Sequence, residues 1–280
     1  MQGKVVVITG GTSGIGREAA RQLAAQGASL VLVGRTAARC AASVAWLKER
    51  VPAAEVSTRV ADLLRLAEMR RLAADLAASL PRIDVLVNNA GAIFDRHEQT
   101  GDGLERTFAL NHMAYFVLTH ALREPLIASA PARIVNTASN AHRGNALDFD
   151  DLQFQRGFRG LTAYARSKLA NILFTRELAR RLAGTGVTAN CLHPGFVSTG
   201  IGQRDGGLFA IMVRMSMLFA RTPEQGASTI VYLATSPDVA GASGGYYVDC
   251  RQAEPTRTAQ DDATARRLWE ESLRLAGLQD

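Results

Sequence analysis

Tyr164 and Lys168 are the two residues of this sequence whose types and spacing best suit proton transfer. Residues four positions apart on a helix share a face, so a helix here would put the phenol beside the ammonium. A phenol transfers protons poorly near neutral pH unless its pKa is lowered, and a neighbouring ammonium can lower it. Taken alone, the pair could also be a chance arrangement on a helix surface.

Two more polar residues are predicted to lie near this pair. Ser139 follows a predicted strand at 133–137, and its hydroxyl can donate to a carbonyl oxygen while Tyr164 delivers the proton. Asn111 places an amide on an otherwise apolar helix face, where it could hold a water that links Lys168 to solvent. The four side chains together predict acid–base catalysis at a carbonyl or alcohol group.

A glycine-rich turn is predicted between the first strand, 4–8, and the helix that follows it. The turn reads Thr9-Gly-Gly-Thr-Ser-Gly-Ile-Gly16, and its predicted cofactor-binding residues are Gly10, Thr12, Ser13, Gly14, Ile15 and Gly16. Glycines allow a tight turn and let the backbone approach a pyrophosphate at the helix N-terminus. The spacing differs from the common G-x-G-x-x-G form, and a purely structural connection is the alternative.

Arg35 follows the second predicted strand, 29–33, and lies 19 positions after Gly16. Dinucleotide-binding folds that take NAD usually carry an acidic residue there, which accepts the ribose 2′-hydroxyl. A guanidinium can instead bind a 2′-phosphate, which a carboxylate would repel. The sequence therefore predicts NADP(H) rather than NAD(H). Arg17 and Arg39 could extend this pocket or could be ordinary surface arginines.

Two further strand ends are predicted to face the cofactor, because the carboxyl ends of parallel strands line the ligand crevice in such sheets. Asp62 and Leu63 follow the third strand and could contact the adenine ring. A helix N-cap is the competing role for Asp62. Asn89, Ala90 and Gly91 follow the fourth strand and should also line the crevice.

The elements that must position these residues alternate along nearly the whole chain. This pattern predicts an α/β fold of the Rossmann type, a doubly wound, seven-stranded and mostly parallel sheet with helices on both faces. The predicted strands lie at 4–8, 29–33, 55–60, 83–87, 133–137, 187–192 and 244–248. The predicted helices lie near 14–26, 36–50, 65–79, 102–128, 162–183, 223–236 and 260–275. No linker interrupts the pattern, so residues 1–280 are predicted to form a single domain.

Composition narrows the class of protein further. The chain is 47% hydrophobic and 21% charged, close to the average for globular proteins. Its net charge is +6, but the arginines are dispersed rather than clustered, which favours solvated helix faces over a nucleic-acid partner. Three widely separated cysteines, with no metal-ligand spacing, indicate a reducing and therefore cytoplasmic location without a metal site. No membrane span is expected.

Together these motifs resemble the short-chain dehydrogenase/reductase family over nearly the whole chain, in the branch with the pattern Thr-Gly-x-x-x-Gly-x-Gly. The resemblance implies that Tyr164 is the general acid/base and that Lys168 both tunes its pKa and binds the cofactor ribose. It implies that Ser139 donates to the substrate oxygen and that Asn111 belongs to a proton relay. A homodimer or homotetramer is also implied.

A narrower resemblance is to the retinol dehydrogenase-like branch, whose members act on carbonyl or alcohol groups of apolar molecules. It rests on the 25-residue gap from Ser139 to Tyr164, with His142-Arg-Gly inside it, and on Leu192-His-Pro-Gly195. A broad-specificity carbonyl reductase or hydroxysteroid dehydrogenase is the alternative enzyme. A non-catalytic NADP-sensing protein is the alternative outside enzymes.

The resemblance also predicts contacts and a lid after the sixth strand. The predicted cofactor contacts there are Pro194, Gly195, Val197 and Thr199. A lid over the substrate is expected at about 200–222, where a Met- and Phe-rich stretch at 208–220 could instead be a plain packed helix or could touch a membrane surface.

Overall fold

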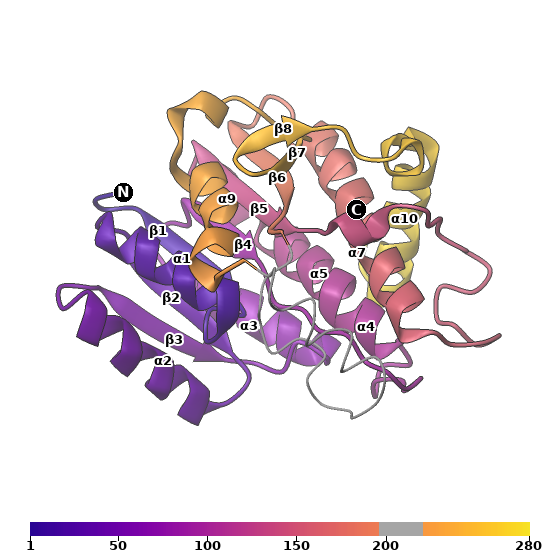
Figure 1. Ribbon diagram of the computed structural model, residues 1–280, viewed down its shortest axis with the longest axis horizontal. Helices are drawn as coiled ribbons and strands as arrows, with labels where there is room; N and C mark the ends of the chain where they lie inside the picture. The colour runs from indigo at the N-terminus through magenta and orange to yellow at the C-terminus, as the bar shows by residue number, and fades with distance from the viewer. Residues whose placement is uncertain (196–220) are drawn as a thin grey trace.

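A computed structural model describes residues 1–195 and 221–280 of the protein, and its centre is one eight-stranded sheet (Figure 1). The strand order is β3-β2-β1-β4-β5-β6-β7-β8, and every neighbouring pair is parallel except β7 with β8. The strands are β1 (Val5–Thr9), β2 (Ser29–Gly34), β3 (Val56–Val60), β4 (Val85–Asn88), β5 (Ala132–Thr137), β6 (Val187–His193), β7 (Tyr246–Val248) and β8 (Arg251–Ala253). The predicted doubly wound α/β fold is confirmed.

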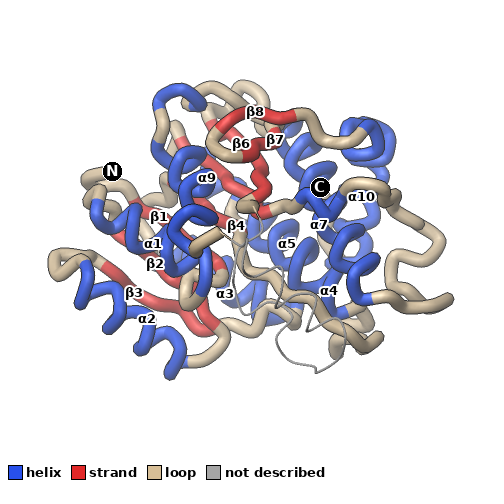
Figure 2. Tube along the Cα trace, viewed as in Figure 1, coloured by secondary structure: helices blue, strands red, loops and turns tan. Residues whose placement is uncertain are grey.

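Helices cover both faces of the sheet (Figure 2). The described helices are α1 (Gly14–Ala25), α2 (Ala37–Arg50), α3 (Leu66–Ser79), α4 (Arg106–Phe108), α5 (Ala114–Ala121), α6 (Arg123–Ala128), α7 (Gly160–Arg181), α9 (Pro223–Thr235) and α10 (Asp262–Ala276). The strand order reverses direction between β1 and β4, which is the switch point where doubly wound sheets bind ligands.

Alternate strand residues build two separate cores, because successive side chains of a strand point to opposite faces. One row across the sheet, formed by Val31, Val7, Leu86, Ile134 and Ala189, packs under α3, α5, α7 and α10. The residues next to this row in the strands pack under α1, α2 and α9. Strands buried on both faces explain the nearly continuous apolar runs of the central strands.

The predicted helix at 102–128 is wrong as one continuous element. The side chain of Glu105 accepts hydrogen bonds from the backbone N–H groups of Thr107 (2.7 Å) and Phe108 (2.8 Å) and so begins α4. A π-helical turn at Ala109–Met113 follows α4, and the helix is interrupted again between α5 and α6. Sequence periodicity does not reveal a π-helical turn. Such a turn adds one residue to a turn of the helix and leaves the apolar character of the segment unchanged.

The eighth strand was not predicted, and seven was therefore one strand too few. β8 pairs antiparallel with β7 through a tight turn at Asp249 and Cys250, both left-handed at φ of 54° and 59°. Hairpin turns of this kind usually carry Asn-Gly or Asp-Gly, because glycine adopts positive φ without strain. The Asp-Cys turn lacks that signal, so the hairpin could not be predicted from local residue types.

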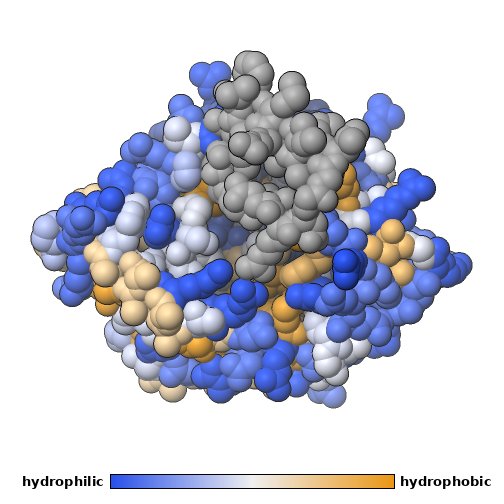
Figure 3. All heavy atoms as spheres, turned by 60° about the horizontal axis from the view of Figure 1, so that its bottom comes forward, coloured by the Kyte–Doolittle hydropathy of each residue, from blue (hydrophilic) through white to orange (hydrophobic). Residues whose placement is uncertain are grey.

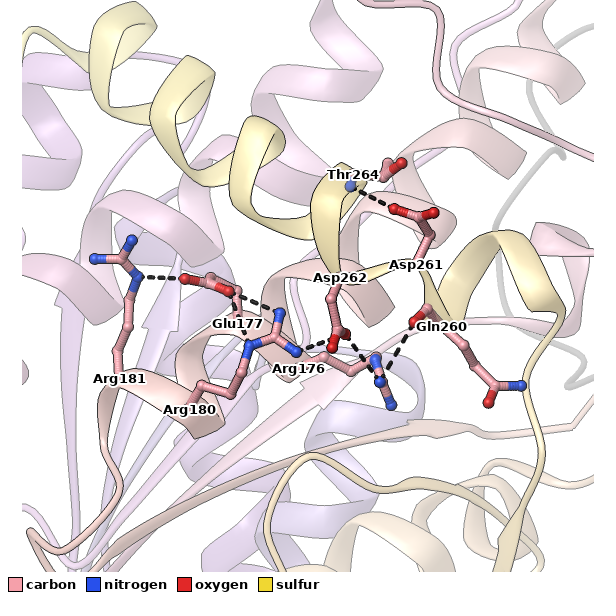
Figure 4. A network of polar contacts seen from close by, with 8 residues as sticks. All are labelled: Arg176, Glu177, Arg180, Arg181, Gln260, Asp261, Asp262 and Thr264. Carbon is pink, nitrogen blue, oxygen red and sulfur yellow. Dashed lines mark hydrogen bonds and ion pairs between the residues drawn. The ribbon is translucent and has the colours of Figure 1, made fainter.

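α10 packs against α7, and the ion pairs drawn in Figure 4 join the two helices. Asp262 accepts from Arg176 (3.1 Å) and Arg180 (2.6 Å), and Glu177 pairs with Arg180 and Arg181. Beside this network, Trp269 is buried against aromatic rings of α5 and α7. No helix among the described residues is long and apolar enough to cross a membrane.

Candidate active site

The ends of β1 and β4 are tied together at the switch point of the sheet. The Thr9 hydroxyl accepts hydrogen bonds from the backbone N–H groups of Asn89 (2.9 Å) and Ala90 (3.1 Å). In return, the Asn89 side-chain amide donates to the carbonyls of Thr9 (3.2 Å) and Gly10 (3.4 Å). The predicted glycine turn and the predicted Asn89–Gly91 segment therefore lie side by side.

The glycine turn packs too closely against its neighbours to admit a larger residue. A Cβ on Gly10, whose φ is +66°, would lie 2.9 Å from the Ala90 Cα, and a Cβ on Gly16 would collide with the Gly10 carbonyl oxygen and the Asn89 amide. The side chain of Ser13 does not cap α1, and the first turn of that helix has no acidic residue. An open helix N-terminus behind a close-fitting glycine turn suits a pyrophosphate.

Replacing Gly16 with alanine is expected to damage both folding and cofactor binding. The added methyl group must push apart backbone and amide groups that join β1 to β4, which typically costs about 1–3 kcal/mol of the free energy of unfolding. Dinucleotide affinity should fall at least about tenfold, which corresponds to about 1.4 kcal/mol. Urea unfolding and NADPH titration would measure both effects. Gly241→Ala is the matched control, since a Cβ there would meet nothing within 4 Å; equal affinity in both variants would contradict this view of the turn.

Arg35 stands at the exposed end of β2, close to the glycine turn. A Cβ on the preceding Gly34 would lie 2.6 Å from a methyl carbon of Thr12, so the two segments touch. Arg35 forms no ion pair with the residues that the structure describes. Arg17, in contrast, stacks its guanidinium 4.3 Å from the ring centre of Trp46. Among the described residues, the guanidinium of Arg35 is therefore unpaired beside the turn, whereas that of Arg17 is stacked on Trp46.

Asp62 and Leu63 lie in the connection between β3 and α3. The carboxylate of Asp62 accepts a hydrogen bond from the Leu64 N–H (3.2 Å), and Leu63 is buried. α3 begins only at Leu66, whose N–H is bonded to Asp102 instead (2.8 Å). The alternative N-cap role for Asp62 is thus wrong, and its carboxylate shapes the turn that carries Leu63.

Lys168 is the most enclosed member of the predicted catalytic group. Its side chain is buried, with the residue 3% exposed, and Nζ donates to the Thr137 carbonyl (3.0 Å). Nζ also lies 5.5 Å from the ring centre of Tyr164 and 5.7 Å from that of Tyr115. The ammonium therefore sits between two phenol rings, with Ser139 next to the Tyr164 hydroxyl.

The electrostatics of this pair differ from the expectation. Burial raises the pKa of Tyr164 above its ordinary value, and the neighbouring Ser139 hydroxyl opposes that shift only in part. Burial also lowers the pKa of Lys168 to about 7. The net shift of the Tyr164 pKa is therefore upward, whereas a net lowering by the ammonium was expected. The reason is that a dry site disfavours phenolate and ammonium alike.

Ser139 is held by its own backbone surroundings. Its Oγ accepts from the Ala141 N–H (3.1 Å), and its carbonyl lies 2.7 Å from His142 Nδ1. The other ring nitrogen of His142 accepts from the Thr256 N–H (3.2 Å), so the ring hydrogen must be on Nδ1 and donated to Ser139. The hydroxyl hydrogen of Ser139 is left to donate to a ligand.

Asn111 lies in the π-helical turn and is fully buried. Its amide bonds both the carbonyl and the N–H of Ala92 (2.9 Å each) and donates to Ser167 Oγ (3.0 Å). These bonds occupy the side chain that was expected to hold a water. A Cβ on Gly91 would lie 3.1 Å from Asn111 Oδ1 and 3.6 Å from Lys168 Nζ, so the three residues adjoin.

The last predicted contacts follow β6. Pro194 and Gly195 are described, and a Cβ on Gly195, whose φ is +85°, would lie 2.6 Å from the Arg221 side chain. Val197, Thr199 and the predicted lid, apart from its last two residues, lie outside the described residues.

Several residues of the site were not predicted. These are the Thr137 carbonyl, the Tyr115 ring, His142 in its role beside Ser139, and Asn171, whose amide reaches the same carbonyl as Lys168. Asn171 could have been suspected, since it lies three residues after Lys168 on the same helix face. The role of the Thr137 backbone carbonyl could not be predicted, because every residue carries such a carbonyl whatever its type.

Comparisons with known proteins agree with this arrangement. Residues 4–206 match the short chain dehydrogenase family. Human retinol dehydrogenase 13 is 40% identical over 283 residues, a match that covers 99% of this chain and 86% of the relative. Human retinol dehydrogenase 12 is 38% identical, covering 99% and 88%.

Solved structures share the fold. A protein of Mycobacterium paratuberculosis superposes with a TM-score of 0.79 at 29% identity, covering 99% of this chain and 95% of that one. A short chain dehydrogenase from Burkholderia cenocepacia, in complex with NADP, gives a TM-score of 0.70 at 28% identity, covering 88% and 95%. This chain therefore belongs to the short-chain dehydrogenase/reductase family of oxidoreductases, in its retinol dehydrogenase-like branch.

Proposed function

We propose that this protein transfers hydride between NADP(H) and a carbonyl or alcohol group of an apolar small molecule, with reduction as the working direction. The observation that carries the proposal is the convergence of Ser139, Tyr164 and buried Lys168 beside the glycine turn. Cells usually keep NADP reduced, which favours the reductive direction.

The protein's own residues divide the proton chemistry between them. Ser139 holds the carbonyl oxygen by donating its free hydroxyl hydrogen, and Tyr164 gives its proton to the same oxygen. A raised Tyr164 pKa keeps the phenol protonated before the reaction, as a proton donor must be. Lys168, fixed to the Thr137 carbonyl, stabilises the phenolate that is left behind. When bound, NADPH supplies the hydride.

The residues present fit a dinucleotide with a 2′-phosphate. The glycine turn and the uncapped start of α1 would receive the pyrophosphate, and Arg35 would bind the 2′-phosphate. Lys168 would additionally hold the nicotinamide ribose. The NADP complex of the Burkholderia cenocepacia relative supports this choice.

Changing Arg35 to aspartate should reverse the cofactor preference. The loss of a charge-assisted contact and the gain of a repulsive carboxylate should lower kcat/KM with NADPH by about 10–100-fold, or about 1.4–2.7 kcal/mol. Activity with NADH should hold or rise. Steady-state kinetics with both cofactors would measure this. Arg266→Asp, on the exposed face of α10, makes the same charge change away from the site and should leave the ratio unaltered. An unchanged ratio in Arg35→Asp would refute the assignment of NADP(H) to this arginine.

An apolar substrate is favoured by the surface near Tyr164. Leu161, one helical turn before Tyr164 on α7, is 54% exposed, an unusual state for leucine. Figure 3 shows that one face of the molecule carries several hydrophobic patches (orange) on a surface that is otherwise mainly hydrophilic. The relatives named retinol dehydrogenase make retinoid-like aldehydes the first substrates to try.

A substrate panel separates the candidate enzymes. NADPH oxidation should be fastest with long apolar aldehydes such as retinal, and slower with short polar aldehydes and with ketosteroids. Equal rates across the panel would favour a broad-specificity carbonyl reductase, and a ketosteroid optimum would favour a hydroxysteroid dehydrogenase. NADPH binding without turnover of any member would overturn the proposed reaction.

A further inference from the structure

The short turn that begins at Ser139 is tied to the C-terminal part of the chain by polar contacts. Ser139 is the N-cap of a 3₁₀-helical turn at Asn140–His142. The partners of this turn lie more than a hundred residues later, in β7 and in the segment 254–258 that follows β8 at the edge of the sheet (Figure 1). The acid–base chemistry of Ser139, Tyr164 and Lys168 does not by itself account for these contacts.

His142 is the centre of these contacts, and its side chain is fully buried. Nδ1 donates to the Ser139 carbonyl (2.7 Å), and Nε2 accepts from the Thr256 backbone N–H (3.2 Å). Burial lowers the pKa of His142 below its ordinary value, which keeps the ring neutral with its one hydrogen on Nδ1. Both ring nitrogens therefore have a partner, and the ring joins Ser139 to Thr256.

The bond from the ring closes the turn at Ser139. The same carbonyl also accepts from the His142 backbone N–H, but at 3.2 Å, the long end of the usual range. A closed turn keeps the Ala141 N–H 3.1 Å from Ser139 Oγ. Because Oγ accepts this bond, its own hydrogen is directed away from the turn and toward a ligand.

Tyr246 on β7 holds the same turn from another side. Its hydroxyl donates to Asn140 Oδ1 (2.8 Å). Its ring packs edge-to-face on the ring of His142, with the two centres 5.4 Å apart, an arrangement that aromatic pairs prefer. The His142 ring therefore cannot turn away from Ser139 without losing this packing.

Two outer bonds join the segment after β8 to the same loop. The Thr258 hydroxyl donates to the Asn145 carbonyl (3.3 Å), and the Arg143 guanidinium donates to the Glu254 carbonyl (3.4 Å). Both bonds are exposed to solvent, whereas the His142 ring is buried. Water competes for the outer bonds, so the ring supplies the firmest connection between the two segments.

We propose that His142 is a positioning residue, which fixes the turn so that the Ser139 hydroxyl hydrogen faces the substrate oxygen, while the segment after β8 holds the ring through Thr256. The inference rests on the proposed function of Ser139. Pairing within the sheet does not fix this turn, because the last bond from β5 to β6 is donated by Ala138, to the Leu192 carbonyl (2.8 Å). Ser139 is the first residue beyond it.

Loss of the ring bond should slow the reaction without weakening the binding of either ligand. The bond from Ser139 strengthens as the substrate oxygen gains negative charge in the transition state, so kcat should fall while KM for the carbonyl substrate changes little. The Kd for NADPH should stay the same, since the glycine turn is held by β1 and β4. A general loss of structure would instead raise the NADPH Kd.

The first test needs no measurement of activity. Nitrogen-15 NMR of the histidine rings in the full-length protein distinguishes the two neutral tautomers and the charged ring, with His142 assigned by comparison with His142→Phe. The inference predicts a neutral ring with its hydrogen on Nδ1 at pH 7. A hydrogen on Nε2, in either a neutral or a charged ring, would overturn it.

The second test separates the two bonds of the ring in NADPH-dependent reduction of retinal. His142→Phe removes both bonds and should lower kcat by about 5–50-fold. His142→Asn puts an amide donor near the place of Nδ1 and should keep kcat within about threefold of wild type. His142→Gln puts an amide oxygen near the place of Nε2, which serves Thr256 but not Ser139, and should be as slow as His142→Phe. His120→Phe, stacked on Phe116 away from this turn, is the control and should keep the wild-type rate.

The third test asks whether His142 acts through Ser139. In a Ser139→Ala background, whose kcat should already be lower by about 10²-fold, adding His142→Phe should cost less than about a further twofold. An equal loss in both backgrounds would overturn the inference, as would an unchanged kcat in His142→Phe or a faster Gln than Asn variant. If His142→Phe does not fold, the comparison of Asn with Gln decides. An inactive wild type would instead refute the proposed function, and the NMR result would still decide the tautomer.

Discussion

Replacing Tyr164 with phenylalanine is expected to lower kcat by about 10²–10⁴-fold, the usual contribution of a positioned general acid. Phenylalanine keeps the ring against Lys168 Nζ, 5.5 Å from its centre, and removes only the hydroxyl that gives the proton. KM for the carbonyl substrate should change little, because Ser139 still donates to the oxygen. The decrease in NADPH absorbance with retinal as substrate would measure the effect.

Tyr232→Phe is the matched control for this change. Tyr232 lies on α9, on the face of the sheet opposite to α7. Its ring centre lies 6.4 Å from that of Tyr247. It should retain the wild-type rate. A turnover in Tyr164→Phe within a few-fold of wild type would contradict the assignment of Tyr164 as the proton donor.

Replacing Lys168 with methionine should greatly reduce activity and yet stabilise the protein. The variant cannot stabilise the Tyr164 phenolate, so kcat should fall by about 10²–10⁴-fold. It also avoids placing an ammonium in a site where burial lowers the Lys168 pKa to about 7. Methionine fills the same space, and the Thr137 carbonyl keeps its bond from Asn171. We expect a gain of about 1–3 kcal/mol in the free energy of unfolding at pH 6.

The pH dependence of that gain follows from the direction of the pKa shift. In the unfolded chain Lys168 stays protonated up to a pKa of about 10.4, whereas the folded site holds the proton only below about 7. Between these values the unfolded chain binds more protons, so the wild-type protein gains stability as the pH rises. The advantage of Lys168→Met is therefore full below pH 7 and shrinks above it.

Urea unfolding at pH 6 and pH 9 without cofactor would measure both quantities. Lys48→Met, on the exposed face of α2, is the control and should show no pH-dependent difference from wild type. If Lys168→Met were less stable than wild type at pH 6, or if its advantage did not shrink at pH 9, the burial cost assigned to this ammonium would be wrong.

The central elements of the fold could be predicted because their apolar patterns are local. β1, β2, β5 and β6 lie within one or two residues of their predicted ranges, since strands buried on both faces read as continuous apolar runs. The π-helical turn at Ala109–Met113 and the Asp249-Cys250 hairpin were missed, because tertiary contacts rather than local signals determine them.

The candidate site was predictable to the same extent. Tyr164 and Lys168 share a helix face, and Ser139 follows a strand. Spacing in the sequence is therefore enough to predict that these three side chains lie close together. The bond from Lys168 to the Thr137 carbonyl joins segments far apart in the sequence, which no local pattern relates. The direction of the Tyr164 pKa shift could not be predicted from the sequence either, since it depends on how deeply the phenol is buried.

The most direct test of the proposed reaction follows the hydride itself. NADPH carrying deuterium at both C4 positions would be incubated with retinal and the wild-type protein, and the alcohol analysed by mass spectrometry. Hydride transfer predicts an alcohol that carries one deuterium on the carbinol carbon, and at least about 100-fold less of it with Tyr164→Phe over the same time. An alcohol without deuterium, or oxidation of NADPH with no alcohol formed, would contradict it.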